Sequence, residues 1–414
     1  MLKIVSTKQV RLGMFIHELK GSWIDHPFWK KAFKLEDASD LKKLQASAIK
    51  EVVIDTSKGL DVLEDVQPAV VQPQSNQSEA STQASALPAD AAPAVKSPPK
   101  VKRITSSEER ARAKQVISAS KKAVTSMFND VRMGKAIKAE AAMQFVDEIA
   151  ESVARNEGAL ISLVRLKTKD DYTYMHSVAV CALMVALAKE LGMSEQHVKQ
   201  AGLAGLLHDI GKAAVPLDVL NKPGALTDDE FSLVKLHPER GHELLMQANI
   251  TDSVALDVCL HHHEKVNGTG YPHRLEGEAI SLFARMGAVC DVYDAVTSNR
   301  PYKEGWEPGV SLQRMAQWAG HFDEVVFKAF VKSVGIYPIG SMVKLKSGRL
   351  AVVIDQSPKS LLTPIVKVFF STKSKTRLPV EVIDLSKGSA SDSIVGHEDP
   401  ILWGVHDVAK LWAE

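Results

Sequence analysis

From about Asp171 to His321, nearly every segment of this chain carries apolar residues at helical spacing. Glycines stand where such helices should end: Gly192 follows Ala186–Leu191, and Gly211 follows Gly202–Asp209. Thr227 and Glu230 have the spacing of a capping box, which predicts a helix start. The pattern therefore predicts an all-α domain, and a chain that is mainly α.

Histidines and carboxylates interrupt these apolar helices. A lone histidine on a helix is usually a surface residue or a core residue whose hydrogen bonds are satisfied. A functional role is therefore inferred only because several histidines and carboxylates occur together. His176 opens one helix, His208 and Asp209 close another, and His237 is expected near the end of a third. A fourth ends in His261-His262-His263-Glu264, and Asp291 lies inside a fifth. Burying such groups unpaired costs several kcal/mol, so they must pair with one another or bind metal.

The chemistry of this set favours metal. Neutral imidazoles and carboxylates without a nearby thiolate suit iron, manganese or zinc rather than a structural zinc site rich in cysteine. There are more candidate ligands than one ion needs. Two-metal sites usually activate water for in-line attack on phosphorus. The sequence therefore predicts a two-metal site that hydrolyses a phosphate ester.

The rest of the chain divides by composition. Residues 1–65 alternate strand-like and helical patterns, with strands expected at Leu2–Val5, Met14–Leu19 and Glu51–Asp55 and a helix at Ala38–Ala48, and predict a small α/β module. Residues 66–104, rich in Pro, Ala, Gln and Ser, predict a disordered linker. Connecting helices are expected at 105–160, starting at Ser106, then the main domain at 161–338. β-Branched runs at Ser341–Leu345, Leu350–Ile354 and Ile365–Phe370 predict a β-rich C-terminal appendage, 339–414.

Bulk composition excludes several other classes. The 414 residues hold 51 Lys and Arg against 50 Asp and Glu, so no global field points to a nucleic acid polymer or an anionic membrane. Three cysteines in apolar runs predict buried thiols and no structural disulfide. The first residues lack a secretory apolar core, and the longest apolar run, Val178–Ala188, falls well short of the roughly 20 residues of a membrane span. We expect a cytoplasmic protein without membrane insertion.

Two motifs carry a family resemblance. The segment Leu207–Lys212 (LHDIGK) resembles the signature of the HD phosphohydrolase superfamily, and His262–Pro272 (HHEKVNGTGYP) resembles the second signature of its HD-GYP subfamily. Asp291–Ala295 followed by Thr297–Tyr302 is similar to the downstream family segment. The resemblance covers roughly residues 150–335. More weakly, the first 65 residues resemble a small uncharacterised domain that often precedes HD-GYP domains.

The resemblance implies roles for particular residues. It implies two divalent metal ions, iron or manganese, with Asp209 as the bridging carboxylate. Lys212 would contact a substrate phosphate and act with Asp209 in catalysis, while Gly270, Tyr271, Arg300 and Lys303 would contact substrate. Family members that bind a third ion carry a glutamate four residues before the first histidine ligand, where this chain has Tyr172, so we expect two ions. The implied metal ligands are His176, His208, Asp209, His237, His262, His263 and Asp291.

Neighbouring residues are expected to play lesser parts. His261 lies outside the family register and is not expected to be a ligand. Glu264 suits a role in orienting a ligand histidine. Asn267 stands where the family commonly has Asp, which removes a charge from the loop but no ligand.

The implied activity is hydrolysis of cyclic di-GMP to linear pGpG or further to GMP. Two alternatives stay open: a cyclic di-GMP sensor that turns over slowly or not at all, acting through a partner, and a nucleotide phosphohydrolase of the wider superfamily, which would leave the Gly268–Pro272 loop unused. The resemblance also suggests diguanylate cyclase (GGDEF) domains as partners, and a homodimer.

Overall fold

The computed structural model describes residues 2–20, 33–46, 49–62, 104–135, 137, 139–166, 172–222, 224–298, 305–357, 360–387 and 392–413. The chain forms two compact units, Met1–Val101 and Lys102–Glu414. The predicted linker 66–104 lies outside the described residues except for its last position, so its disorder stays a prediction. Within the described part of the chain, none of the helices combines the length and hydropathy that crossing a bilayer requires.

The first unit is a small sheet with one helix. Its strands are β1 (Leu2–Ser6), β2 (Phe15–Lys20), β3 (Phe33–Lys34) and β4 (Glu51–Asp55), in the order β1-β4-β2-β3, and the helix is α1 (Ala38–Ala46). Ile16, Leu35, Leu44 and Ile54 are fully buried between sheet and helix. The predicted α/β pattern is present, and β3 is an addition that the sequence did not indicate.

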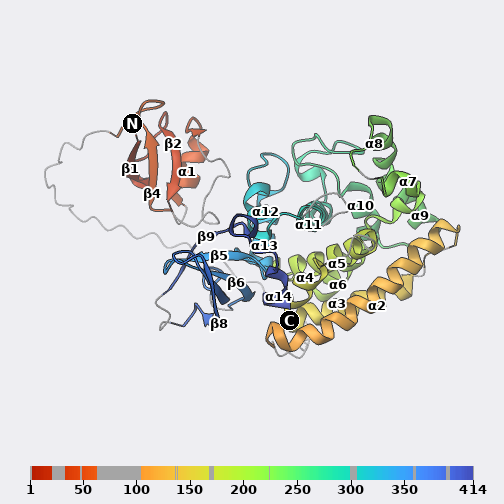
Figure 1. Cartoon of the computed structure of the whole chain (residues 1–414). Coiled ribbons are helices and arrows are strands. Elements are labelled where there is room, and N and C mark those ends of the chain that lie inside the picture. The colour runs from red at the N-terminus through yellow and green to blue at the C-terminus, as the bar shows by residue number, and fades with distance from the viewer. Residues whose placement is uncertain are drawn as a thin grey trace, which may run out of the picture. The chain divides into compact units, whose positions relative to one another are not determined.

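Helices form most of the second unit (Figure 1). α2 begins after Thr105, whose side chain and Glu108 form a capping box. α5 is buried on every side from Met175 to Ala188, so it is the central helix, and it packs against α6 and α11. The helices are α2 (Ser106–Arg132), α3 (Ala139–Arg155), α4 (Glu157–Val164), α5 (Tyr172–Glu190), α6 (Glu195–Leu207), α7 (Leu217–Leu220), α8 (Asp228–Val234), α9 (His237–Gln247), α10 (Ser253–His261), α11 (Leu282–Thr297), α12 (Pro308–Met315) and α13 (Glu324–Val334).

Two expected helix boundaries need correction. The segment after α6 is a short 3-10 helix, η4 (Ile210–Ala214), and Gly211 lies inside it rather than at a left-handed helix end. His237 is the first residue of α9, not a residue near the end of a helix. Pro238 signals that helix start, because proline is favoured in the first turn of a helix.

A five-stranded antiparallel sheet follows the helices, in the order β8-β7-β6-β5-β9. Three of its strands lie where the sequence predicts them, and two strands and a C-terminal helix were not predicted. Mainly α, with a small α/β module and C-terminal strands, is therefore the confirmed fold class. The elements are β5 (Met342–Leu345), β6 (Arg349–Asp355), β7 (Ile365–Ser371), β8 (Thr376–Asp384), β9 (Ile394–His397), the 3-10 helix η6 (Pro400–Trp403) and α14 (Val408–Ala413).

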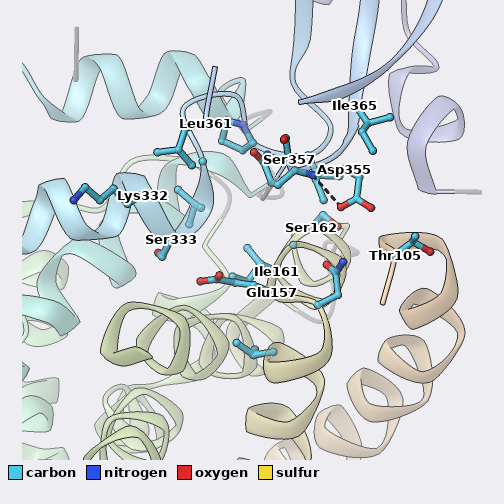
Figure 2. A pocket seen from close by; sticks show the side chains of 18 of the residues that line it. Thr105, Glu157, Ile161, Ser162, Lys332, Ser333, Asp355, Ser357, Leu361 and Ile365 are labelled. Carbon is cyan, nitrogen blue, oxygen red and sulfur yellow. Dashed lines mark hydrogen bonds between the residues drawn. The ribbon is translucent and has the colours of Figure 1, made fainter. Parts of the chain in front are cut away.

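One cavity of about 630 Å³ lies between the start of α2, α4, the end of α13 and the segment after β6. Figure 2 shows Glu157, Lys332 and Asp355 around it. Its lining includes none of the seven predicted metal ligands. This cavity is therefore separate from the predicted metal centre.

Candidate metal centre

Five helices bring the seven predicted ligands together. α5 carries His176, α9 begins with His237, and α11 carries Asp291. His208 and Asp209 directly follow the end of α6 and precede η4. His262 and His263 follow the end of α10. Their ligand atoms form two groups within 4.8 Å: Asp209, His237, His262 and His263 in one, and His176, His208 and Asp291 in the other.

Asp209 faces both groups at once. Its Oδ2 lies 3.4 Å from Nε2 of His176 and 3.4 Å from Nε2 of His208. Its Oδ1 lies 3.2 Å from Nε2 of His237 and 3.7 Å from Nε2 of His262. A carboxylate whose two oxygens face separate sets of imidazoles has the geometry required to bridge two cations.

Asp291 divides its oxygens in a similar way. Its Oδ1 lies 2.9 Å from Nε2 of His176 and 4.0 Å from Nε2 of His208, and its Oδ2 lies 3.7 Å from Nδ1 of His263. The two carboxylates thus lie among the imidazoles rather than at the rim of the cluster.

Hydrogen bonds to backbone carbonyls orient three of the imidazoles. Nδ1 of His208 donates to Gly205 O at 2.8 Å, Nδ1 of His237 to Val234 O at 2.7 Å, and Nδ1 of His262 to Val258 O at 2.9 Å. A carbonyl can only accept, so each Nδ1 carries the proton and each Nε2 keeps its lone pair. These Nε2 atoms are the ones that face Asp209, as metal ligands require.

His176 is oriented differently, by a carboxylate that sequence reasoning overlooked. Its Nδ1 lies 2.6 Å from Oδ2 of Asp294, which is 1% exposed. Asp291 and Asp294 are three residues apart on α11, so they share a helix face. That spacing, within an otherwise apolar helix, is the signal that could have identified Asp294.

The centre is deeply buried, and its charge state fits metal binding. Burial lowers the pKa of His263 to about 3 and that of His262 well below its usual value. Burial alone would raise the pKa of Asp209, but Lys212 and His208 outweigh it and hold that pKa well below the ordinary range. His262 and His263 are therefore neutral and Asp209 is ionised, which are the forms that ligate cations.

Two buried atoms test whether a cation fits. Nε2 of His208 and Oδ1 of Asp209 are buried and find no hydrogen-bond partner among the described residues. Leaving such atoms unsatisfied costs about 1–3 kcal/mol each, and more for a charged group. A divalent cation between imidazoles and carboxylates would satisfy both atoms. All three cysteines are buried and free, and none of them is among these seven residues.

Gly211 explains how η4 comes so close to α9. A Cβ on Gly211 would lie 1.9 Å from His237 O and 2.5 Å from the backbone N of Gly241. A Cβ on Gly241 would in turn lie 3.0 Å from the backbone N of Gly211. The absence of both side chains lets two backbones touch, and this contact brings Asp209 beside His237.

Cationic and aromatic side chains border the centre. Nζ of Lys212 donates to Oδ2 of Asp209, and the side chain is 22% exposed. The ring of Tyr271 stacks on His263, with centroids 4.7 Å apart. Nζ of Lys235 lies 5.3 Å from the centroid of Tyr271. Lys235 was not predicted, because nothing in its local sequence sets it apart from a solvated lysine.

The loop after His263 is shaped by two glycines and one carboxylate. Gly268 has a φ of +71°, and a Cβ on Gly270 would lie 2.5 Å from Cα of Glu264. Gly270 therefore permits a close backbone approach, and its contact with substrate stays a prediction. Buried Glu264 accepts the backbone N–H groups of His273 and Leu275 at 2.7 and 3.1 Å. Its predicted role in orienting a ligand histidine is wrong, since both oxygens hold the loop.

The remaining predicted residues fall outside this set. His261 bonds to Asp257 and His273 and belongs to neither ligand group. Asn267 accepts from Thr269 within the loop. Arg300 and Lys303 lie outside the described residues, and the side chain of Tyr172 does too.

Comparison with known proteins agrees with the motifs. Residues 149–326 match the family described as "HD domain", and residues 2–142 match "Domain of unknown function (DUF3391)". The chain is 53% identical over 413 residues, 100% of its length and 96% of the relative's, to "Cyclic di-GMP phosphodiesterase PA4108" of Pseudomonas aeruginosa.

Two further relatives match a smaller part of the chain. "Cyclic di-GMP phosphodiesterase response regulator RpfG" of Xanthomonas campestris is 49% identical over 127 residues, 30% of this chain and 34% of that one. "3'3'-cGAMP-specific phosphodiesterase 1" of Vibrio cholerae is 36% identical over 167 residues, 40% of this chain and 38% of that one. With an identity of 53% along nearly the whole of one relative, and an HD-domain match over the helices that carry the histidine cluster, the chain belongs to the HD-domain family and carries an N-terminal DUF3391 segment.

Proposed function

We propose that this chain is a metal-dependent phosphodiesterase that hydrolyses cyclic di-GMP to linear pGpG or further to GMP in bacterial signalling. The observation that carries the proposal is the placement of Asp209, whose two oxygens face separate groups of imidazoles beside the ammonium of Lys212. The full-length similarity to a curated cyclic di-GMP phosphodiesterase supports the choice of substrate.

The proposed cofactors are two divalent ions, iron or manganese. His176, His208 and Asp291 would hold one, and His237, His262 and His263 the other, with Asp209 shared between them. When bound, such a pair supplies Lewis-acid stabilisation and an activated water for in-line attack on phosphorus. Because Asp170 and Asp171 lie outside the described residues, the two-ion count rests on the position of Tyr172 in the sequence and on the two ligand groups.

The other residues would act on the substrate directly. Lys212 lies at the partly exposed edge of the centre, where its ammonium can hold a phosphate oxygen and stabilise the charge that develops during attack. Tyr271, stacked on His263, offers a flat face beside the cluster for a base or sugar. Arg300 and Lys303 are proposed to contact substrate on the strength of the family resemblance.

The first test is hydrolysis of cyclic di-GMP by purified protein, with the metal content of the same sample measured. Asp209→Ala should abolish turnover and lower metal content, because both ions lose a shared ligand. Lys199→Ala is a matched surface control, since Lys199 pairs with Asp147 at a solvent-exposed position. Turnover with full metal occupancy in Asp209→Ala would contradict the proposal.

Lys212→Ala separates the roles of the neighbouring residues. It should retain the metals but lose on the order of 10²-fold in rate, the typical cost of removing one preorganised charge. A rate equal to wild type would leave Lys212 as a helix-terminus lysine without a catalytic role.

The rival functions give different product patterns. A sensor would bind cyclic di-GMP without turnover, although the complete set of seven ligands favours catalysis. A general nucleotide phosphohydrolase would hydrolyse dNTPs, and 3'3'-cGAMP serves as the second cyclic dinucleotide because one relative is named for it. We expect cyclic di-GMP to be hydrolysed fastest. GGDEF-domain partners and a homodimer stay predictions from the family resemblance.

A further inference from the structure

His261 and His273 form a second histidine pair, outside the metal centre. His261 is the last residue of α10, and His273 directly follows Tyr271 and Pro272 in the site loop. Nε2 of His261 lies 3.0 Å from Nδ1 of His273. His273 is exposed and the side chain of His261 is 15% exposed, so solvent reaches the pair.

A carboxylate orients His261 as it would a metal ligand. Nδ1 of His261 donates to Oδ1 of Asp257 at 2.7 Å, and the other oxygen of Asp257 accepts from Oγ of Ser281. The proton therefore stays on Nδ1, and Nε2 presents its lone pair to His273. A carboxylate that fixes the tautomer of a histidine is a common arrangement behind metal-binding imidazoles.

The spacing of the two rings suits a shared cation. Their centroids are 5.2 Å apart, against 5.1, 4.9 and 5.3 Å for the pairs His176–His208, His208–His262 and His237–His262 in the centre itself. Two imidazoles on one tetrahedral zinc, with Zn–N bonds of about 2.0–2.1 Å, have their nitrogens about 3.3 Å apart. The two nitrogens of His261 and His273 are 3.0 Å apart, so the rings would have to move apart only slightly to bind such an ion.

From these contacts we infer that His261 and His273 bind a borderline divalent transition metal such as Zn²⁺, with water completing its coordination. Imidazole pairs favour zinc, nickel and copper over magnesium or calcium. No proton is lost from the pair: the proton of His273 moves from Nδ1 to Nε2 on its exposed ring. Because the backbone N–H of His273 donates to Glu264, a metal here would tie the site loop to the end of α10.

Zinc uptake by untagged protein, retaining the metals with which it is purified, tests this inference. After equilibrium dialysis against Zn²⁺, elemental analysis of each sample counts zinc and the original metals together. Wild type should gain one zinc ion per chain without losing its original metals. His273→Gln should gain none. His406→Gln, at another exposed histidine, should behave as wild type.

A second variant examines the orienting carboxylate. Asp257→Asn should weaken zinc binding at this site by about tenfold or more, as expected for loss of a carboxylate behind a ligand histidine. Equal uptake by wild type and His273→Gln, zinc that enters only as the original metals leave, or unchanged affinity in Asp257→Asn would each overturn the inference. Cyclic di-GMP turnover does not enter these measurements, so they are independent of the proposed function.

Discussion

At the scale of single residues, the histidines of the centre differ in the group that accepts a hydrogen bond from Nδ1. Three histidines use backbone carbonyls, which substitution cannot remove, but His176 depends on the side chain of Asp294. Among these four hydrogen bonds, the one between Asp294 and His176 is therefore the one that a side-chain substitution can remove.

Asp294→Asn should lower metal affinity about 10- to 100-fold while leaving the protein folded, because the amide is a weaker acceptor for the Nδ1 proton of His176. Metal content after dialysis against a chelator measures the effect. Asp218→Asn, at an exposed position in the first turn of α7, is the control. Metal retention equal to wild type in Asp294→Asn would show that His176 needs no orienting partner.

The sequence indicated which side chains gather in the cluster better than it indicated the residues that orient them. Ligands are recognisable because an imidazole or carboxylate buried in an apolar helix needs a partner that offsets the cost of its burial. The residues that orient a ligand depend on which side chains meet in the folded chain. Glu264 is an example, because its position beside His263 suggested a histidine partner. Its oxygens instead accept backbone N–H groups nine and eleven residues further along the chain. Lys235 likewise contacts the ring of Tyr271 only because α8 ends near that residue.

At the scale of elements, helices were predictable from periodicity, but their contacts were not. Gly211 was interpreted as the end of a helix, since glycine commonly stands there. Its actual role, contact with the first turn of α9, requires knowing that η4 and α9 are neighbours.

Gly211→Ala should therefore be far more harmful than an ordinary glycine substitution. A Cβ 1.9 Å from a backbone carbonyl forces η4 away from α9, at a cost of about 3 kcal/mol in the free energy of unfolding, and separates Asp209 from His237. Urea unfolding and metal analysis should both register the change. Gly396→Ala, where the added Cβ meets nothing within 4 Å, should stay near wild type. Equal stabilities for the two variants would refute the contact.

At the scale of the whole molecule, residues Lys102–Glu414 form one compact unit that contains both the helices and the C-terminal sheet. Trp412 on α14 is 3% exposed, lies over Gly340, and is 5.8 Å from the guanidinium of Arg165. Arg165 in turn donates to Ile339 O at 2.6 Å. This end of the chain is thus packed onto residues that follow α4. The predicted domain boundary between residues 338 and 339 stays a prediction.

Trp412→Ala should lower the free energy of unfolding of the whole unit by about 3 kcal/mol, the usual cost of truncating a buried tryptophan. A single, shifted thermal transition is expected, with metal content unchanged in the folded protein. If a small transition separates while the main one stays in place, the sheet folds independently of the helices.

The backbone contacts behind His208, His237 and His262 also bear on how this centre could be moved to another protein. Each carbonyl lies three or four residues before its histidine, so a segment of four or five residues is enough to fix the tautomer. A designer who transfers these three segments to another protein would therefore keep the proton of each histidine on Nδ1. His176 cannot be moved in the same way, because its proton is fixed by a residue 118 positions away in the sequence.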